Sequence, residues 1–203
     1  MQTRKKFFTA RNVATLGILA ALVILFQGVL GMVPLGSTTC GAFALVPIAL
    51  GAILLGPIAG AFLGFLFGVM AICGGLFGGD MFTKTLLSLV PLQTVLICLV
   101  KGTLAGAACG LLYRLVAKCN AHVGVFAAAA IAPVVNTGIF LLGALLIKDA
   151  ILAVMAENAV SFGAFVIPIL TANFLFEFII SLILSPAIYV IMQVVTKQMR
   201  RRS

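Results

Sequence analysis

Charged residues are scarce in this sequence, and tryptophan is absent. Lys, Arg, Asp and Glu together make up 8% of the 203 residues, against about 25% in an ordinary soluble domain. So little polar material cannot cover a water-exposed surface, which excludes a soluble globular protein. The absence of tryptophan excludes a binding site that stacks a large ring between indole side chains.

Residues that perform chemistry are also few. The chain has one histidine, four acidic residues and five cysteines, and the cysteines show neither Cys-x-x-Cys nor histidine-paired metal spacing. Glu177 is the one acidic residue within a long apolar run, and the sequence has no P-loop and no His-Glu-x-x-His motif. We therefore expect a protein that is not an enzyme and that has no metal site and no cofactor.

Apolar residues dominate the chain, at 64% of its length and a mean hydropathy of +1.32. Backbone groups inside a bilayer must bond within their own segment, so the expected spanning element is a helix of about 20 residues. We predict a single all-α integral membrane domain over residues 1–203. Its apolar segments are 12–34, 44–55, 57–73, about 86–117, 123–147 and 162–195.

Basic residues decide between six helices and five, the count obtained if residues 44–73 form one interrupted span. Lys and Arg gather on the cytoplasmic side of short loops. Six helices with a cytoplasmic N-terminus place ten of the 13 basic residues inside, with Lys84 and Lys148 outside and Lys101 within a span. The ten are Arg4, Lys5, Lys6, Arg11, Arg114, Lys118, Lys197, Arg200, Arg201 and Arg202. Five helices would put two strongly basic termini on opposite faces, so we predict six helices with both termini cytoplasmic.

The same distribution accounts for the net charge of +9 without nucleic acid. Basic side chains at the cytoplasmic surface attract anionic lipid, so membrane lipid is an expected partner and nucleic acid is not. The first apolar run is too long for a typical signal-peptide core, and we expect it to be retained as a helix.

Glycine recurs at every fourth position of the third apolar segment, as Gly56, Gly60, Gly64 and Gly68. Because lipid is as apolar as leucine, helices associate in a membrane through close packing at small residues. We expect this ridge to pack internally against a neighbouring helix. A docking surface for another protein is the alternative.

A second row of small residues lies beside the basic start of the first apolar segment. Its members are Ala10, Ala14, Gly17 and Ala21, spaced four, three and four positions apart. Close approach of another helix requires such a row, and its place in the cytoplasmic half of the helix suits the docking of a partner.

Three stretches carry a resemblance to a known family: the basic start running into ATLGILAALVILFQ, the hairpin FALVPIALGAILLGPIAGAFLGFLFG, and NTGIFLLG in the fifth helix. In their order, spacing and total length, they make the chain similar to the substrate-binding S component of an energy-coupling factor (ECF) vitamin transporter. The resemblance implies a six-helix bundle in the cell (plasma) membrane, with a vitamin-sized ligand held near the outer face.

The same resemblance implies partners and a docking motif. The partners are a transmembrane coupling subunit and two cytoplasmic ATPase subunits, since an S component hydrolyses nothing itself. The family's Ala-x-x-x-Ala coupling motif is matched by Ala10 and Ala14, and Gly17 and Ala21 continue the row.

Polar side chains inside apolar spans are candidate ligand contacts. They are Lys101, Asn136, Thr137, Asn173 and Glu177, and we expect all but Thr137 to bind substrate. Asn173 and Glu177 share one helix face at positions i and i+4. The alternatives are that Lys101 and Glu177 pair with each other and that the asparagines only join neighbouring helices. A Lys101 not paired with Glu177 suits an anionic ligand group such as a carboxylate, and this is the hypothesis we favour.

Two connections are candidate lids over a ligand. Residues 35–43 are small and hydroxyl-rich, and we count Thr38 and Thr39 among the substrate contacts. An ordinary flexible loop is the alternative. The same two interpretations apply to residues 73–84, whose four glycines favour mobility.

The vitamin is not fixed by composition. The stretch PVVNTGIFLLG and the glycine-rich third helix resemble the pantothenate-type branch most closely, and the carboxylate of pantothenate suits Lys101. Riboflavin, folate and a cobalamin precursor are alternatives. Two other classes stay open: a stand-alone secondary transporter, although the halves show no internal repeat, and a non-transporting membrane scaffold protein.

Overall fold

The computed structural model describes residues 9–32, 34–35, 38–39, 43–155 and 162–201. Helices make up nearly all of it, together with one antiparallel pair of two-residue strands. The elements in chain order are α1 (Ala10–Gly28), the 3-10 helix η1 (Leu30–Met32), β1 (Pro34–Leu35), β2 (Thr38–Thr39), α2 (Leu45–Leu55), α3 (Pro57–Leu76), α4 (Met81–Leu89), α5 (Pro91–Val116), α6 (Ala121–Leu146), α7 (Lys148–Met155) and α8 (Phe162–Arg201).

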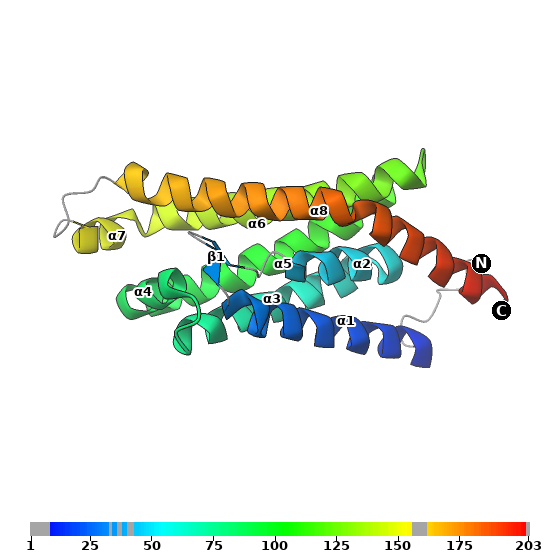
Figure 1. Ribbon diagram of the computed structural model, residues 1–203, viewed down its shortest axis with the longest axis horizontal. Coiled ribbons are helices and arrows are strands. Elements are labelled where there is room, and N and C mark those ends of the chain that lie inside the picture. The colour runs from blue at the N-terminus through cyan, green and yellow to red at the C-terminus, as the bar shows by residue number, and fades with distance from the viewer. Residues whose placement is uncertain (1–8, 33, 36–37, 40–42, 156–161, 202–203) are drawn as a thin grey trace, which may run out of the picture.

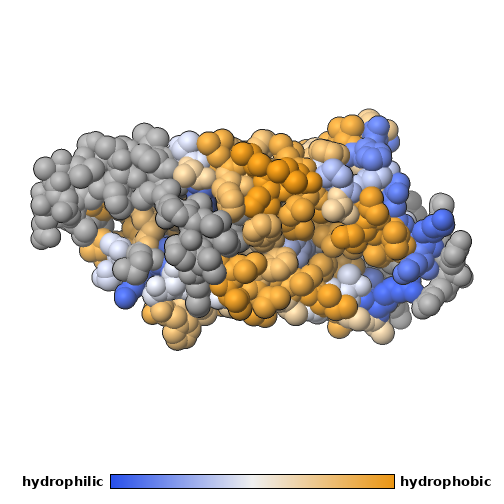
Figure 2. Space-filling model, in the orientation of Figure 1, coloured by the Kyte–Doolittle hydropathy of each residue, from blue (hydrophilic) through white to orange (hydrophobic). Residues whose placement is uncertain are grey.

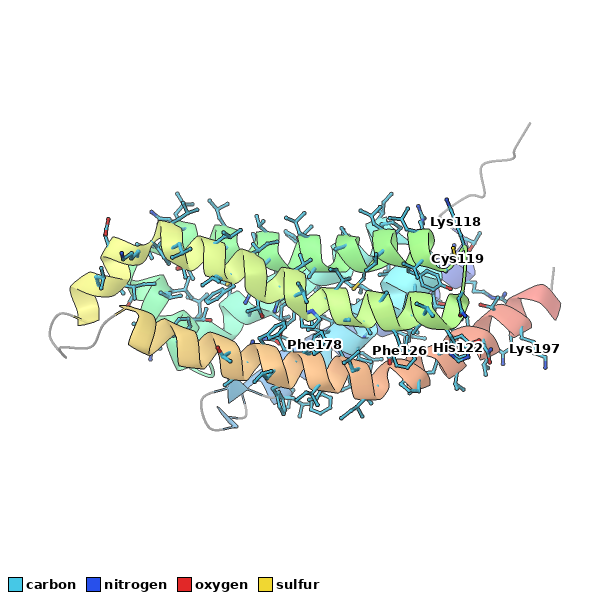
Figure 3. All side chains as sticks on the ribbon, turned by 90° about the horizontal axis from the view of Figure 1, so that it is seen from above. Lys118, Cys119, His122, Phe126, Phe178 and Lys197 are labelled. Carbon is cyan, nitrogen blue, oxygen red and sulfur yellow. The ribbon has the colours of Figure 1, made fainter. Side chains whose placement is uncertain are left out.

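The long helices run side by side and form an elongated bundle (Figure 1). α1 begins and α8 ends at the same end of this bundle, where α5 also leads into α6, while α4 and α7 lie at the other end. The first of these ends carries the exposed residues Arg11, Arg114, Lys118 and Lys197, and we call it the basic end. Figure 3 shows Lys118 and Lys197 there.

The opposite end carries a mixed set of charges. Lys84 on α4 and Lys148 on α7 lie there with Asp80 and Asp149. The two groups of basic residues that the sequence separates are therefore at opposite ends of the bundle. The exposure of the basic end to the cytoplasm stays a prediction.

Within the described residues, five helices are long and apolar enough to cross a membrane, namely α1, α3, α5, α6 and the part of α8 from Thr171 to Gln198. α2 has 11 residues and is roughly 16 Å long, about half of a hydrocarbon core. The all-α membrane class is therefore confirmed, and the count of six spans stays a prediction.

The predicted break between the second and third apolar segments is confirmed. Gly56 has a φ of 103°, a backbone conformation that residues other than glycine rarely adopt. Pro57 follows as the first residue of α3, where its missing N–H is not needed. α2 packs in the bundle interior, with eight of its 11 residues buried.

The predicted span over about 86–117 is wrong at its start, because two helices lie there. Residues up to Leu89 belong to α4, and α5 begins at Pro91. Val90 between them has a φ of −137° and a ψ of 68°, since a proline disfavours the helical conformation in the residue before it. The first span is shorter than predicted, since α1 ends at Gly28, and α7 was not predicted at all.

The glycine ridge of α3 packs against α5, so the internal interpretation is confirmed and the docking alternative is wrong. A Cβ built at Gly64 would meet the carbonyl group of Gly102, and one built at Gly102 would meet that of Gly64. Gly60 and Gly106 form a second reciprocal pair, and Gly68 lies against a carbonyl of α5 in the same way. The two backbones touch along this seam because no side chain separates them.

α8 bends in its last third (Figure 1). Pro186 of α8 has no N–H to donate, so the carbonyl oxygen of Leu182, four residues back, loses its helical partner, and a proline inside a helix bends it. The buried Ser185 hydroxyl donates to that oxygen at 2.7 Å. The serine thus satisfies a carbonyl that the proline leaves free.

The outer surface of the bundle is apolar in its middle. Figure 2 shows hydrophobic residues across the middle of one face and hydrophilic residues gathered at the basic end. Exposed leucine, isoleucine, valine and phenylalanine occur on every long helix. Such a band is what contact with lipid requires.

Candidate functional site

Glu177 is the centre of a polar cluster within the bundle. It lies on α8 and is 4% exposed. Its carboxylate accepts hydrogen bonds from the Asn136 amide nitrogen at 3.0 and 3.2 Å and from the Asn173 amide nitrogen at 2.8 Å. We call Lys101, Asn136, Asn173 and Glu177 the polar cluster.

The two asparagines hold the carboxylate from different elements. Asn173 precedes Glu177 by one turn of α8, as its spacing predicts, whereas Asn136 lies on α6 and is 2% exposed. The bond from Asn136 therefore joins α6 to α8 through a buried carboxylate.

Lys101 approaches the cluster from α5 but does not form an ion pair with Glu177. Its ammonium nitrogen lies 4.7 Å from the ring centroid of Phe140 and 5.9 Å from that of Phe67. No carboxylate in the described part of the chain lies within ion-pairing distance of it. Aromatic faces attract a cation, so the ammonium has partial compensation and keeps its three N–H donors for another group. Of the pairing offered as an alternative, the contact within 4.0 Å is absent, although the charge of Lys101 still acts on Glu177 over a longer distance.

One buried polar atom of the cluster and one of its sequence neighbour Thr137 have no hydrogen-bond partner among the described residues. They are the side-chain carbonyl oxygen of Asn136 and the hydroxyl oxygen of Thr137. The side-chain oxygen of Gln27, at the end of α1, is in the same state. Gln27 was missed by the sequence interpretation, although a glutamine in an apolar span was the available signal.

Thr38 and Thr39 lie in β2, which pairs with β1 through the partners Pro34↔Thr39 and Leu35↔Thr38. β2 contacts α8, the helix that carries Glu177. Residues 36–37 and 40–42 of the predicted lid lie outside the described residues. A role of Thr38 and Thr39 in ligand binding stays a prediction.

The second candidate lid, residues 73–84, is largely helical, and the predicted glycine loop is reduced to the turn between α3 and α4. Gly74 and Gly75 are buried in α3. Asp80 caps α4 by accepting from the backbone nitrogens of Phe82 and Thr83 at 3.1 Å each. A helix end and an N-cap leave a short turn between them.

The small-residue row of α1 faces away from the bundle. Ala10, Ala14, Gly17 and Ala21 are all exposed, and a Cβ added at Gly17 would meet nothing within 4 Å. The buried residues of α1, Leu19 and Val23, lie on its other side. The row is therefore open to a partner or to lipid, in contrast to the buried glycines of α3.

The basic end is held together by side chains from three helices. His122 at the start of α6 stacks on Tyr189 of α8 with 3.4 Å between ring centroids, and Gln193 donates to the Tyr189 hydroxyl at 2.7 Å. Tyr113 of α5 contacts Met192. Among the described residues no group of three or more histidine, cysteine or acidic side chains is arranged to hold a metal ion.

Comparison with known families matches residues 11–189 to the family model described as ECF transporter, substrate-specific component. The matched range contains the whole polar cluster and, apart from Ala10, the α1 row. No curated protein and no solved structure matches the chain.

Proposed function

The chain belongs to the family of ECF transporter substrate-specific components, and from this premise we propose that it binds a vitamin or vitamin precursor for uptake by an ECF-type ABC importer. Membership makes the chain a multi-pass plasma-membrane protein and a transporter component, in a family that is not one of enzymes. The family match is the observation that carries the proposal. It favours this role over a stand-alone secondary transporter or a non-transporting scaffold.

The polar cluster is the proposed ligand site. Lys101 rests on two aromatic rings and has no carboxylate within ion-pairing distance in the described residues, so an anionic group of the ligand can serve as its partner. Pantothenate carries one carboxylate and is the favoured substrate. Riboflavin, which has none, as well as folate and a cobalamin precursor, are the alternatives.

Lys101→Met tests the substrate assignment. We expect the variant to bind pantothenate at least about tenfold more weakly, because it loses a charge-assisted hydrogen bond. Binding of pantothenol, in which an alcohol replaces the carboxylate, should change little. The measurement is equilibrium binding to purified protein in detergent, with Lys84→Met, an exposed lysine of α4, as the matched control. Equal weakening of both compounds would contradict a carboxylate contact.

The α1 row is the proposed contact with the transmembrane coupling subunit. The row is exposed along one face of α1, and Gly17 has open space where a side chain would stand. Two helices can pack closely over such a face. The coupling subunit would connect the chain to two cytoplasmic ATPase subunits.

Gly17→Leu tests the docking surface. Because a leucine would hold the partner helix away, we expect loss of ATP-driven uptake and of co-purification with the ATPase subunits, while ligand binding by the isolated chain is kept. Gly138→Leu is the matched control, since Gly138 on α6 is also exposed and also has nothing within 4 Å of an added Cβ. Equal uptake and co-purification in the Gly17→Leu and Gly138→Leu variants would rule out this surface as the docking site. A loss of ligand binding with Gly17→Leu would do the same.

A further inference from the structure

Thr137 differs from two other threonines of the spanning helices in what its hydroxyl does. Thr94 donates to the carbonyl oxygen of Val90 at 2.8 Å, and Thr103 donates to that of Leu99 at 2.7 Å. A helical threonine normally satisfies itself in this way. The Thr137 hydroxyl oxygen is buried and has no hydrogen-bond partner in the described part of the chain.

In the side chain of Asn136, the residue before Thr137, the nitrogen has hydrogen-bond partners and the oxygen has none. Its amide nitrogen donates to both oxygens of Glu177, and its carbonyl oxygen is buried and without a partner. The residue is 2% exposed. Buried polar atoms are nearly always hydrogen-bonded, so each exception calls for a missing partner.

The two unpaired oxygens require a donor. An amide carbonyl oxygen only accepts hydrogen bonds, and a threonine hydroxyl accepts as well as donates. Glu177 also presents acceptors on this side of α6. A group with O–H or N–H bonds can therefore satisfy both atoms. An apolar group would satisfy neither of them, and a purely anionic group would leave the Asn136 oxygen without a partner.

Lys101 presents the opposite chemistry close by. Its ammonium lies over Phe140, which follows Asn136 by one turn of α6, toward the end of the bundle that carries α4 and α7. Four residues of helix place these two positions roughly 6 Å apart along the axis. The ring that carries the cation thus belongs to a residue one helical turn from Asn136.

We propose that the polar cluster and Thr137 recognise a monocarboxylate that also bears hydroxyl or amide N–H donors, with its carboxylate at Lys101 and its donors at Asn136 and Thr137. This inference rests on the proposed function and adds the orientation of the ligand and a specificity-determining residue. It favours compounds that bear both groups a few bonds apart. Ligands with only one of the two groups should bind more weakly.

The test is a double-mutant cycle between Thr137 and the hydroxyls of a probe ligand. Thr137→Val keeps the shape and the bonds that hold Glu177, and Thr103→Val removes a hydroxyl whose bond lies within its own helix. The probes are pantothenate, its analogue lacking both hydroxyls, and pantothenol. Affinities are measured on the purified full chain in lipid nanodiscs.

We expect Thr137→Val to weaken pantothenate binding about five- to tenfold and Thr103→Val to leave it within about twofold. Loss of the ligand hydroxyls should then cost less in the Thr137→Val variant than in the wild type, because the two changes remove one interaction. The ratio of pantothenate to pantothenol affinity should stay at the wild-type value, since that ratio reports Lys101.

Two results overturn the inference and leave the proposed function standing. One is a Thr137→Val variant that binds like Thr103→Val, with additive effects of the ligand hydroxyls. The other is a wild-type chain that co-purifies with a coupling subunit and ATPases but retains, by mass spectrometry, a ligand without a carboxylate or without O–H and N–H donors. A chain that co-purifies with neither ATPases nor any ligand overturns both.

Discussion

Gly64→Ala should separate the two helices that form the glycine seam. The added methyl group would meet the backbone carbonyl of Gly102, which cannot rotate away as a side chain can. Restoring ordinary van der Waals contact requires α3 and α5 to move apart by about 1 Å or more. The substitution thus overpacks the interface between α3 and α5.

The expected cost follows from two opposing effects. Overpacking a core costs about 1–3 kcal/mol, and the upper part of that range applies because the obstacle is backbone. The better helix propensity of alanine offsets about 1 kcal/mol. We expect a net loss of about 2 kcal/mol, which for a chain of this size lowers the unfolding midpoint by roughly 4–8 °C.

Gly138→Ala is the control, and we expect it to change the unfolding midpoint in the opposite direction or not at all. Nothing lies within 4 Å of a Cβ at Gly138, so only the propensity gain remains and the midpoint should stay or rise. Because the chain has no tryptophan, unfolding in detergent is followed by far-ultraviolet circular dichroism at a fixed heating rate. A Gly64→Ala midpoint equal to or above that of Gly138→Ala would refute the seam as a determinant of stability.

Three further outcomes are expected. Asn136→Leu should lower the free energy of unfolding by about 1–3 kcal/mol, because the buried carboxyl group of Glu177 loses one of its two asparagine donors. Chemical denaturation of the purified variant measures this free energy, and an unchanged value would contradict the hydrogen bond between Asn136 and Glu177. Ser185→Ala should lower the free energy of unfolding by about 1 kcal/mol in the same assay, since the carbonyl oxygen of Leu182 loses its hydroxyl donor, and an unchanged stability would contradict this role of the serine. Cysteines introduced at Lys84 and Lys197 should react with a membrane-impermeant reagent from opposite sides of the membrane, and labelling from one side only would rule out the predicted topology.

The general class of the fold was predictable from composition, while several boundaries were not. The turn at Gly56 and Pro57 follows from local backbone chemistry, and the structure has it where the sequence predicts it. The break at Pro91 obeys the same chemistry. Apolar length does not reveal this break, because apolar residues continue on both sides of Pro91.

The candidate site was predictable in its membership and not in its contacts. Lys101, Asn136 and Glu177 are conspicuous because polar residues in an apolar span are rare. Whether Lys101 pairs with Glu177 depends on the distance between α5 and α8, which no pattern within one helix contains. The structure gives Glu177 two asparagines as donors and gives Lys101 two aromatic rings.

The sequence alone determined that this chain lies in a membrane and which small residues allow close packing. Composition, apolar length and glycine spacing are properties of single segments, so they need no knowledge of the neighbouring helices. The tertiary structure decided which of two similar glycine and alanine rows is used inside the protein. The row of α3 is buried against Gly102 and Gly106, and the row containing Gly17 is open. Both satisfy the same local requirement for close approach, and only the position of neighbouring helices distinguishes an internal seam from a free docking face.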